Sequence, residues 1–266
     1  MLPEPSPLVP QTPFPESSSS IPQCSPCPFF QSSSTGETFQ YEELRLLRKD
    51  GTNFPVDCHC APLLERDEIS GAVLVFQDVT ERQQAAEMIR YMANHDSLTS
   101  LPNRNYCNNR LPQAISLAKR EKRLICLLFI DLDRFKPIND NYGHAMGDKV
   151  LLKVAERLKK MLRASDSVCR LGGDEFVILL ESTLTIGGAE NVAQKTIELL
   201  NEPIIVNGIT CSIGASIGIS IYPVDCHDAD SMLRHADIAM YEAKKKGRNR
   251  YELYPAHAKL SGTSNS

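Results

Sequence analysis

The feature that most constrains the fold is an uninterrupted apolar run, LICLLFI at residues 124–130, which ends directly in Asp131. A membrane span needs roughly 18 such residues, so this run has the length of a strand. No other apolar run is longer, and we expect no membrane span. The run therefore predicts a buried strand that ends in a carboxylate.

Helix and strand patterns alternate around this strand from His95 onward. Apolar periodicity predicts helices near residues 103–123, 148–162, 189–200 and 228–246. Strands are expected at 124–131, in a hairpin around Gly172-Gly173, at 204–206, at 210–222 and at 250–253. This pattern predicts an α+β domain of about 160 residues, with mixed strands and helices on one side.

The first 40 residues have a different composition. They hold nine of the 17 prolines and no Lys or Arg, so they cannot bury enough apolar surface to offset chain entropy. We expect residues 1–40 to be disordered and residues 255–266 to form a flexible tail. A proline-rich ligand for a partner is the alternative for the first segment.

Order is expected to begin near Tyr41. Two alternating runs flank the turn signal Asp50-Gly51, and SGAVLVFQDV supplies a third antiparallel strand. Thr80 and Gln83 then form a capping box in front of a helix over residues 81–94. That helix carries one apolar stripe, which suits a parallel helix pair in a dimer or packing on its own domain: Ala85, Met88, Ile89 and Met92.

Residues 36–84 resemble the C-terminal half of a PAS sensor domain, in the hairpin LLRKDG, the strand GAVLVFQDVTER and the exit helix. The resemblance implies a partial PAS-like antiparallel sheet over residues 41–80, followed by a linker helix. The N-terminal half of such a domain, with the helices that usually enclose a ligand, is replaced here by the Pro/Ser-rich segment.

Charge and cysteine content exclude several classes of protein. A net charge of -4 gives no broad basic field, so duplex nucleic acid is not an expected partner, although a local phosphate site remains open. The nine cysteines are odd in number and do not resemble a secreted disulfide framework. Cys58 and Cys60 alternate with polar residues, which favours a core position over a zinc site. No secretory signal opens the sequence, and we expect a cytoplasmic chain.

Three carboxylates stand at the ends of apolar strands. Asp131 ends the central run, and Asp174 and Glu175 follow the glycine pair Gly172-Gly173. Charges there are unfavourable unless they are paired or bind a cation, and hard oxygen ligands from two neighbouring strands fit Mg²⁺. The alternatives are that each acid ends its strand in solvent and that the glycines form a plain hairpin turn.

Two basic stretches could hold phosphates near these acids. Phe135 and Lys136 open a short helix beside Asp131, where backbone N–H groups can bind an anion. Lys244 and Arg248 are four residues apart and would lie together if the helix continued. The alternative for this second cluster is a set of charges that complements the helix dipole before a stop at Gly247.

Five segments together resemble the GGDEF family of diguanylate cyclases over residues 95–254: HDSLTSLPNR, FIDLDRFKPINDNYGHAMGD, RLGGDEF, SIGIS and ADIAMYEAKKKGRN. The resemblance implies a fold related to polymerase palms and class III nucleotide cyclases, with a central, mostly antiparallel sheet and surrounding helices. It also implies condensation of two GTP molecules to cyclic di-GMP with release of two pyrophosphates.

The resemblance assigns roles by position. Asp131 and Asp174 would ligate Mg²⁺ with the backbone carbonyl of Leu132, and Glu175 would hold a second metal or help to activate the ribose 3'-hydroxyl. Two Mg²⁺ ions per site are implied, with Mn²⁺ as a substitute. The remaining positions would contact guanine, phosphates or other parts of the substrate: Asn139 and Asp148 (guanine), Phe135, Lys136, Lys244 and Arg248 (phosphates), and His144, Gly172 and Gly173. For His144, packing or capping near the site is the alternative.

The resemblance also implies a homodimer, since one domain binds one GTP and the 3'-hydroxyl of one nucleotide must meet the α-phosphate of another. Arg163 and Asp166 match the product-inhibition site, where cyclic di-GMP binds; a weak surface ion pair is the alternative. The alternative to an active enzyme is a catalytically inactive GGDEF domain that binds GTP or cyclic di-GMP and regulates a partner. A third hypothesis is that this chain is a fragment of a longer, membrane-tethered sensor protein.

Overall fold

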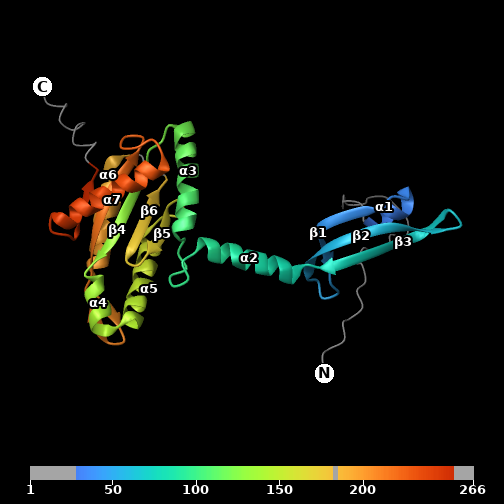
Figure 1. Ribbon diagram of the computed structural model, residues 1–266, viewed down its shortest axis with the longest axis horizontal. Coiled ribbons are helices and arrows are strands. Elements are labelled where there is room, and N and C mark those ends of the chain that lie inside the picture. The colour runs from blue at the N-terminus through green and yellow to red at the C-terminus, as the bar shows by residue number, and fades with distance from the viewer. Residues whose placement is uncertain (1–27, 182–184, 255–266) are drawn as a thin grey trace. The chain divides into compact units, whose positions relative to one another are not determined.

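The computed structural model describes residues 28–181 and 185–254 (Figure 1). The chain divides into two compact units, residues 1–90 and 91–266. Within the described residues, no helix is both long enough and apolar enough to cross a membrane.

The second unit is built on a five-stranded sheet in the order β10-β9-β4-β6-β5. Strand β10 runs parallel to β9, and the other neighbours are antiparallel. The expected α+β fold with a mostly antiparallel sheet is therefore confirmed. The strands are β4 (Ile125–Asp133), β5 (Ser167–Gly172), β6 (Glu175–Leu180), β9 (Gly214–Tyr222) and β10 (Arg250–Leu253).

Both faces of this sheet are covered by helices, as the family resemblance implies. The expectation of helices on one side, which came from the pattern of elements, is therefore wrong. The even-numbered apolar residues of β4 pack into one core with α5 and α6, and the odd-numbered ones pack into a second core with α3 and α7. A strand that is buried on both faces reads as a continuous apolar run, which explains LICLLFI. The helices are α3 (Arg104–Glu121), α4 (Phe135–Tyr142), α5 (His144–Met161), α6 (Ile186–Asn201) and α7 (Ala229–Lys245).

Two further boundaries differ from the sequence prediction. The single strand expected at 210–222 is two strands, because β8 (Ile209–Cys211) pairs with β7 (Ile204–Val206) in a separate hairpin and β9 pairs with β4. Helix α5 begins at His144, four residues before the predicted start at Asp148. A glycine inside the first turn, Gly147, weakens the helical signal there.

The first unit contains an antiparallel sheet in the order β1-β2-β3, together with α1 (Pro28–Thr35). The alternation expected in β2 is confirmed, since Phe54, Val56, Cys58 and Cys60 are all buried. The expectation of disorder over residues 1–40 is corrected for 28–40, which form α1 and the start of β1; residues 1–27 and the expected tail at 255–266 lie outside the described residues. The strands are β1 (Phe39–Leu47), β2 (Asn53–Glu65) and β3 (Glu68–Asp78).

Helix α2 (Thr80–Asn94) follows β3 and buries none of its residues. Its start is held by Asp78, whose Oδ1 accepts from the backbone N–H of Thr80 at 2.9 Å and from the Thr80 hydroxyl at 2.5 Å. Thr80 is thus the first helical residue, and the predicted capping box is wrong. The expected apolar stripe is exposed, with Met88 at 60%, Ile89 at 64% and Met92 at 62%.

Candidate active site

Two acidic residues face each other across neighbouring strands, at one end of the inner strands of the central sheet. Asp131 of β4 lies directly opposite Glu175 of β6 in the antiparallel register. Residues that are paired in this way point to the same face, here the face covered by α3 and α7. Like charges placed opposite each other are destabilising, so this arrangement calls for cations.

Basic side chains from the two covering helices supply part of that charge. Lys244 of α7 places its Nζ 2.6 Å from Asp131 Oδ2, and Arg104 of α3 places its Nη2 3.5 Å from Glu175 Oε2. Burial nevertheless raises the pKa of Asp131, and the neighbouring carboxylates of Asp174 and Asp133 raise it further, against the lowering effect of Lys244. The site therefore retains an excess of negative charge that a divalent cation would neutralise.

The glycine pair shapes the turn that carries Asp174. Gly172 has a φ of 141° and Gly173 a φ of 54°, values that L side chains rarely adopt. A Cβ added at either residue would meet nothing within 4 Å, so the turn borders open space. The backbone N–H of Leu132 donates to the Asp174 carbonyl at 3.2 Å and ties the turn to β4. Asp131, Leu132 and Asp174 are thus brought together as the sequence predicts.

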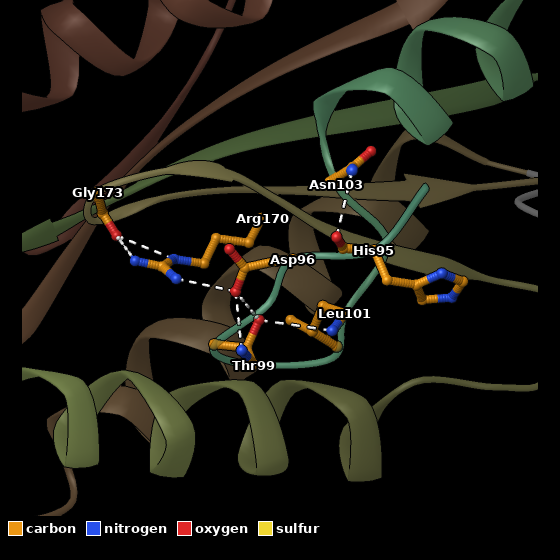
Figure 2. A network of polar contacts seen from close by, with 7 residues as sticks. All are labelled: His95, Asp96, Thr99, Leu101, Asn103, Arg170 and Gly173. Carbon is orange, nitrogen blue, oxygen red and sulfur yellow. Dashed lines mark hydrogen bonds and ion pairs between the residues drawn. The ribbon is translucent and has the colours of Figure 1, made fainter. Parts of the chain in front are cut away.

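A buried arginine, Arg170, holds this turn from below (Figure 2). Its Nε and Nη2 donate to the Gly173 carbonyl at 3.1 and 2.8 Å, and its Nη1 donates to Asp96 Oδ1 at 2.9 Å. The Arg170 side chain is only 9% exposed. Sequence reasoning assigned it no role, although a charged residue inside an apolar strand just before the glycines was the available signal.

Asp96 belongs to the turn that precedes α3 and is itself held in place. Its Oδ1 accepts from the Thr99 backbone N–H at 2.8 Å and from the Thr99 hydroxyl at 2.6 Å. Burial alone would raise the pKa of Asp96, but these bonds and the Arg170 guanidinium keep that pKa below its ordinary value. The segment HDSLTSLPNR is therefore physically joined to RLGGDEF.

Two of the basic residues expected at the phosphates, Lys244 and Arg248, do not share a helix face. Helix α7 ends at Lys245, and Arg248 has a φ of 61° beyond the stop at Gly247. Arg248 Nε instead lies 3.8 Å from Asp133 Oδ1. The helix does not continue to Arg248, so the condition for placing Lys244 and Arg248 on one helix face is not met, and the alternative of a stop before Gly247 holds. Each of the two residues contacts a different carboxylate of β4.

Asp133 is a functional candidate that sequence reasoning missed. This buried carboxylate accepts from the Ser216 hydroxyl at 2.9 Å and from the Asn249 backbone N–H at 2.9 Å. It therefore fixes the left-handed turn that carries Arg248. Its two-residue spacing from Asp131, which puts both carboxylates on one face of β4, was a usable signal.

The remaining predicted substrate residues lie on α4 and in the first five residues of α5. Phe135 is buried and Asn139 half-buried, whereas Lys136, His144 and Asp148 are exposed. Asn139 packs where a side chain at position 147 would stand, since a Cβ added to Gly147 would overlap the Asn139 Oδ1 and crowd Phe135. Gly147, which sequence reasoning did not single out, is therefore needed for the position of Asn139.

Arg163 and Asp166 lie in the turn between α5 and β5. Both border a groove of about 520 Å³ that also includes Tyr91, His95 and Lys159. This turn precedes the start of β5, whereas the glycine turn follows its end, so the two sites lie roughly 17 Å apart along the strand. The expected inhibitory residues thus lie away from the acidic cluster, at the opposite end of β5.

The donor set at the acidic cluster fits a hard cation that is shared with a substrate. Among the described residues, no three His, Cys, Asp or Glu side chains gather in an arrangement that could hold a metal by themselves. The available oxygens are the carboxylates of Asp131 and Asp174 and the backbone carbonyl of Leu132. Mg²⁺ is bound in this way, through one or two carboxylates, several waters and substrate phosphates.

The second unit is thus an α+β domain whose mostly antiparallel sheet carries an acidic, glycine-bordered turn beside its central strand. The sequence matches the family described as "Diguanylate cyclase, GGDEF domain" over residues 93–250, and the chain belongs to this family. A PAS domain match covers residues 12–81, so a PAS domain precedes the GGDEF domain. This match begins earlier in the chain than the segment identified from the sequence.

Known proteins resemble this chain over the same region. The bifunctional diguanylate cyclase/cyclic di-GMP phosphodiesterase MucR of Pseudomonas aeruginosa is 44% identical over 172 residues, which cover 65% of this chain and 25% of MucR. The crystal structure of the TpbB GGDEF domain from the same organism has 43% identity and a TM-score of 0.58, covering 59% of this chain and 98% of that domain.

A third relative was solved with a ligand. The coiled coil and GGDEF domain of DgcB from Caulobacter crescentus, in complex with c-di-GMP, has 26% identity and a TM-score of 0.60. The match covers 66% of this chain and 93% of that structure. This chain spans only about a quarter of the length of MucR.

Proposed function

We propose that this chain is a diguanylate cyclase that condenses two GTP molecules to cyclic di-GMP and releases two pyrophosphates. The observation that carries the proposal is the register of β4 and β6, which puts Asp131 opposite Glu175 beside the glycine turn of Asp174. Because GTP is a cytoplasmic nucleotide, we propose the cytoplasm as the compartment.

Each GTP would lie between the acidic cluster and the start of α4. Asp131, Asp174 and the Leu132 carbonyl would hold Mg²⁺, with Glu175 beside a second ion or the attacking hydroxyl. Two bound Mg²⁺ ions would neutralise the triphosphate and polarise the reacting oxygens. Mn²⁺ would be able to replace Mg²⁺ at these positions.

Other side chains of this chain would bind and orient the nucleotide. Asn139 and Asp148 would recognise the guanine edge, with His144 near them. Lys136 and the backbone at Phe135 would contact the phosphates, as would Lys244 and Arg248 once GTP competes for them with Asp131 and Asp133. Gly172 and Gly173 would leave room for the nucleotide to approach the backbone.

The reaction joins two nucleotides, so it would occur between two copies of the domain. The 3'-hydroxyl of one GTP would give its proton to Glu175 or to a water while its oxygen attacks the α-phosphorus of the other GTP. The bond from that phosphorus to the oxygen of the leaving pyrophosphate would break. A second transfer of the same kind, in which the two nucleotides exchange roles, closes the ring and releases the second pyrophosphate. The exposed stripe on α2, with Met88, Ile89 and Met92, supports a homodimer in which two such helices pack together.

The product assay tests the proposal directly. Purified chain with GTP and Mg²⁺ should yield cyclic di-GMP, detected by chromatography and mass spectrometry, and Asp174→Asn should yield none. Asp174→Asn removes one charge at nearly constant size, so unchanged thermal unfolding would assign the loss to chemistry. A folded dimer that binds GTP but makes no cyclic di-GMP would favour the catalytically inactive GGDEF domain instead.

We further propose that cyclic di-GMP inhibits the chain at Arg163 and Asp166. An arginine can bind a guanine edge with two hydrogen bonds, and a carboxylate can accept from ring N–H groups. Inhibition by added cyclic di-GMP should be lost in Arg163→Ala while turnover at low product remains. Equal inhibition of both proteins would refute this assignment.

A further inference from the structure

The groove beside Arg163 and Asp166 is lined by further residues to which the proposed inhibitory site gives no role. Its volume of about 520 Å³ lies within the usual range for small-molecule sites. Part of the wall is the turn between α5 and β5, and part is the C-terminal end of α2 with the loop that follows it. All of these residues belong to the second unit.

An aromatic pair stands in that second part of the wall. The rings of Tyr91 and His95 are stacked, with centroids 3.9 Å apart and planes inclined by 8°. His95 Nδ1 lies 3.0 Å from the Tyr91 carbonyl oxygen, which fixes the imidazole relative to the helix. Figure 2 shows the His95 ring directed away from the Arg170 network. The two rings cover one face of each other, so each has only its outer face left for a ligand. Both residues border the groove, and Tyr91 is half exposed.

The charged groups of the groove are available to a ligand. Arg163 and Lys159 are both exposed, and neither forms an ion pair with any residue that the structure describes. Asp166 is half-buried, and from the part of the chain that the structure describes its side chain accepts one long hydrogen bond, 3.4 Å, from the Ser165 hydroxyl. Two cations, one carboxylate and a stacked aromatic pair form a set that matches phosphate, a purine edge and a purine face.

We propose that the groove binds a guanine nucleotide whose base stacks on the Tyr91–His95 pair while Lys159 contacts a phosphate. The inference rests on the proposed inhibitory site for its base-edge contacts, at Arg163 and Asp166. The stacking pair and Lys159 are new parts of that site. A ligand bound in this way joins the end of α2 to the α5–β5 turn, two segments about 70 residues apart in the chain.

Fluorescence can test the stacking directly, because the chain contains no tryptophan. In Tyr91→Trp the new indole would be the single tryptophan, and a guanine stacked on it should quench its emission. We expect saturable quenching by cyclic di-GMP, and no quenching when Arg163→Ala is added. Tyr241→Trp, at an exposed tyrosine on α7 outside the groove, is the matched control and should not respond.

Calorimetric titration with cyclic di-GMP gives the magnitude. Stacking of one base on an aromatic side chain corresponds to a loss of about 5- to 150-fold in affinity when the ring is removed. We expect a weakening in this range for Tyr91→Ala, a smaller one for Lys159→Ala, and near wild-type affinity for Tyr91→Phe, which keeps the ring.

The outcomes separate this inference from the proposals beneath it. Unchanged affinity in Tyr91→Ala and His95→Ala, with binding lost in Arg163→Ala, would overturn the stacking and leave the inhibitory pair intact. Absence of cyclic di-GMP binding to the wild-type chain would overturn both, whereas synthesis of cyclic di-GMP from GTP would still be measured independently.

Discussion

Arg170→Ala tests how the glycine turn is held. The substitution removes two hydrogen bonds to the Gly173 carbonyl and the ion pair with Asp96. We expect both a loss of stability and a loss of turnover, because Asp174 directly follows the carbonyl that would be released. Arg170→Lys keeps a positive charge near Asp96 but lacks the two guanidinium N–H groups that bind the Gly173 carbonyl. Compared with Arg170→Ala, it should therefore restore stability more than turnover.

The magnitude follows from burial. Breaking a buried ion pair typically costs 3–5 kcal/mol, as a rough range. Asp96 keeps its two bonds from Thr99 and its side chain is 20% exposed, so the lower end applies, about 3 kcal/mol. For a domain of this size that corresponds to a decrease of roughly 6–12 °C in Tm.

The assay needs a control that loses stability elsewhere. Arg157 donates to the carbonyls of Leu199, Glu202 and Pro203 at the end of α6, which also gives three hydrogen bonds. Arg157→Ala should lower Tm but leave kcat unchanged at a temperature where the protein is folded. Under the same conditions Arg170→Ala should lower kcat. Equal kcat values for the two variants would refute the positioning role of Arg170.

Three further predictions concern other parts of the chain. Ile89→Asp combined with Met92→Asp should lower cyclic di-GMP synthesis at low protein concentration and leave GTP binding intact, because charges replace the exposed stripe of α2; unchanged turnover would contradict the dimer role of that helix. Gly147→Ala should displace Asn139 and raise the KM for GTP by about tenfold, since a base contact is worth roughly 1–3 kcal/mol. The control is Gly187→Ala, where an added Cβ meets nothing within 4 Å, and it should leave the KM unchanged. The pKa of Asp96 is lowered in the folded state, so its contribution to stability is present above the unfolded pKa, about 3.9, and is lost as the pH falls through the folded pKa. Below about pH 4, Asp96→Asn should therefore lose unfolding free energy less steeply than the wild type. Parallel curves of unfolding free energy against pH would contradict this.

The sequence predicted the elements that have a strong local signal. The run before Asp131 is a strand, the residues after Gly172-Gly173 enter β6, and the closing strand at 250–253 has the expected bounds. Those signals arise from apolar runs and turn residues that lie close together in the chain. The same is true of the alternation in β2, whose buried face includes Cys58 and Cys60.

What the sequence did not predict depends on contacts between distant segments. The position of Lys244 on Asp131 requires α7 to cover β4, and local periodicity does not indicate which face of a sheet a helix covers. The roles of Arg170 and Asp133 follow from partners more than 70 residues away, Asp96 and Ser216. Gly147 acquires its role only when α4 packs on α5.

The measurement that tests the central claim most directly is the simultaneous quantification of pyrophosphate and cyclic di-GMP from GTP and Mg²⁺ over a series of protein concentrations. The proposed reaction predicts two pyrophosphates for each cyclic di-GMP, a specific activity that rises as the chain dimerises, and no product from Asp174→Asn. A folded, dimeric wild-type chain that binds GTP but releases no pyrophosphate would contradict it.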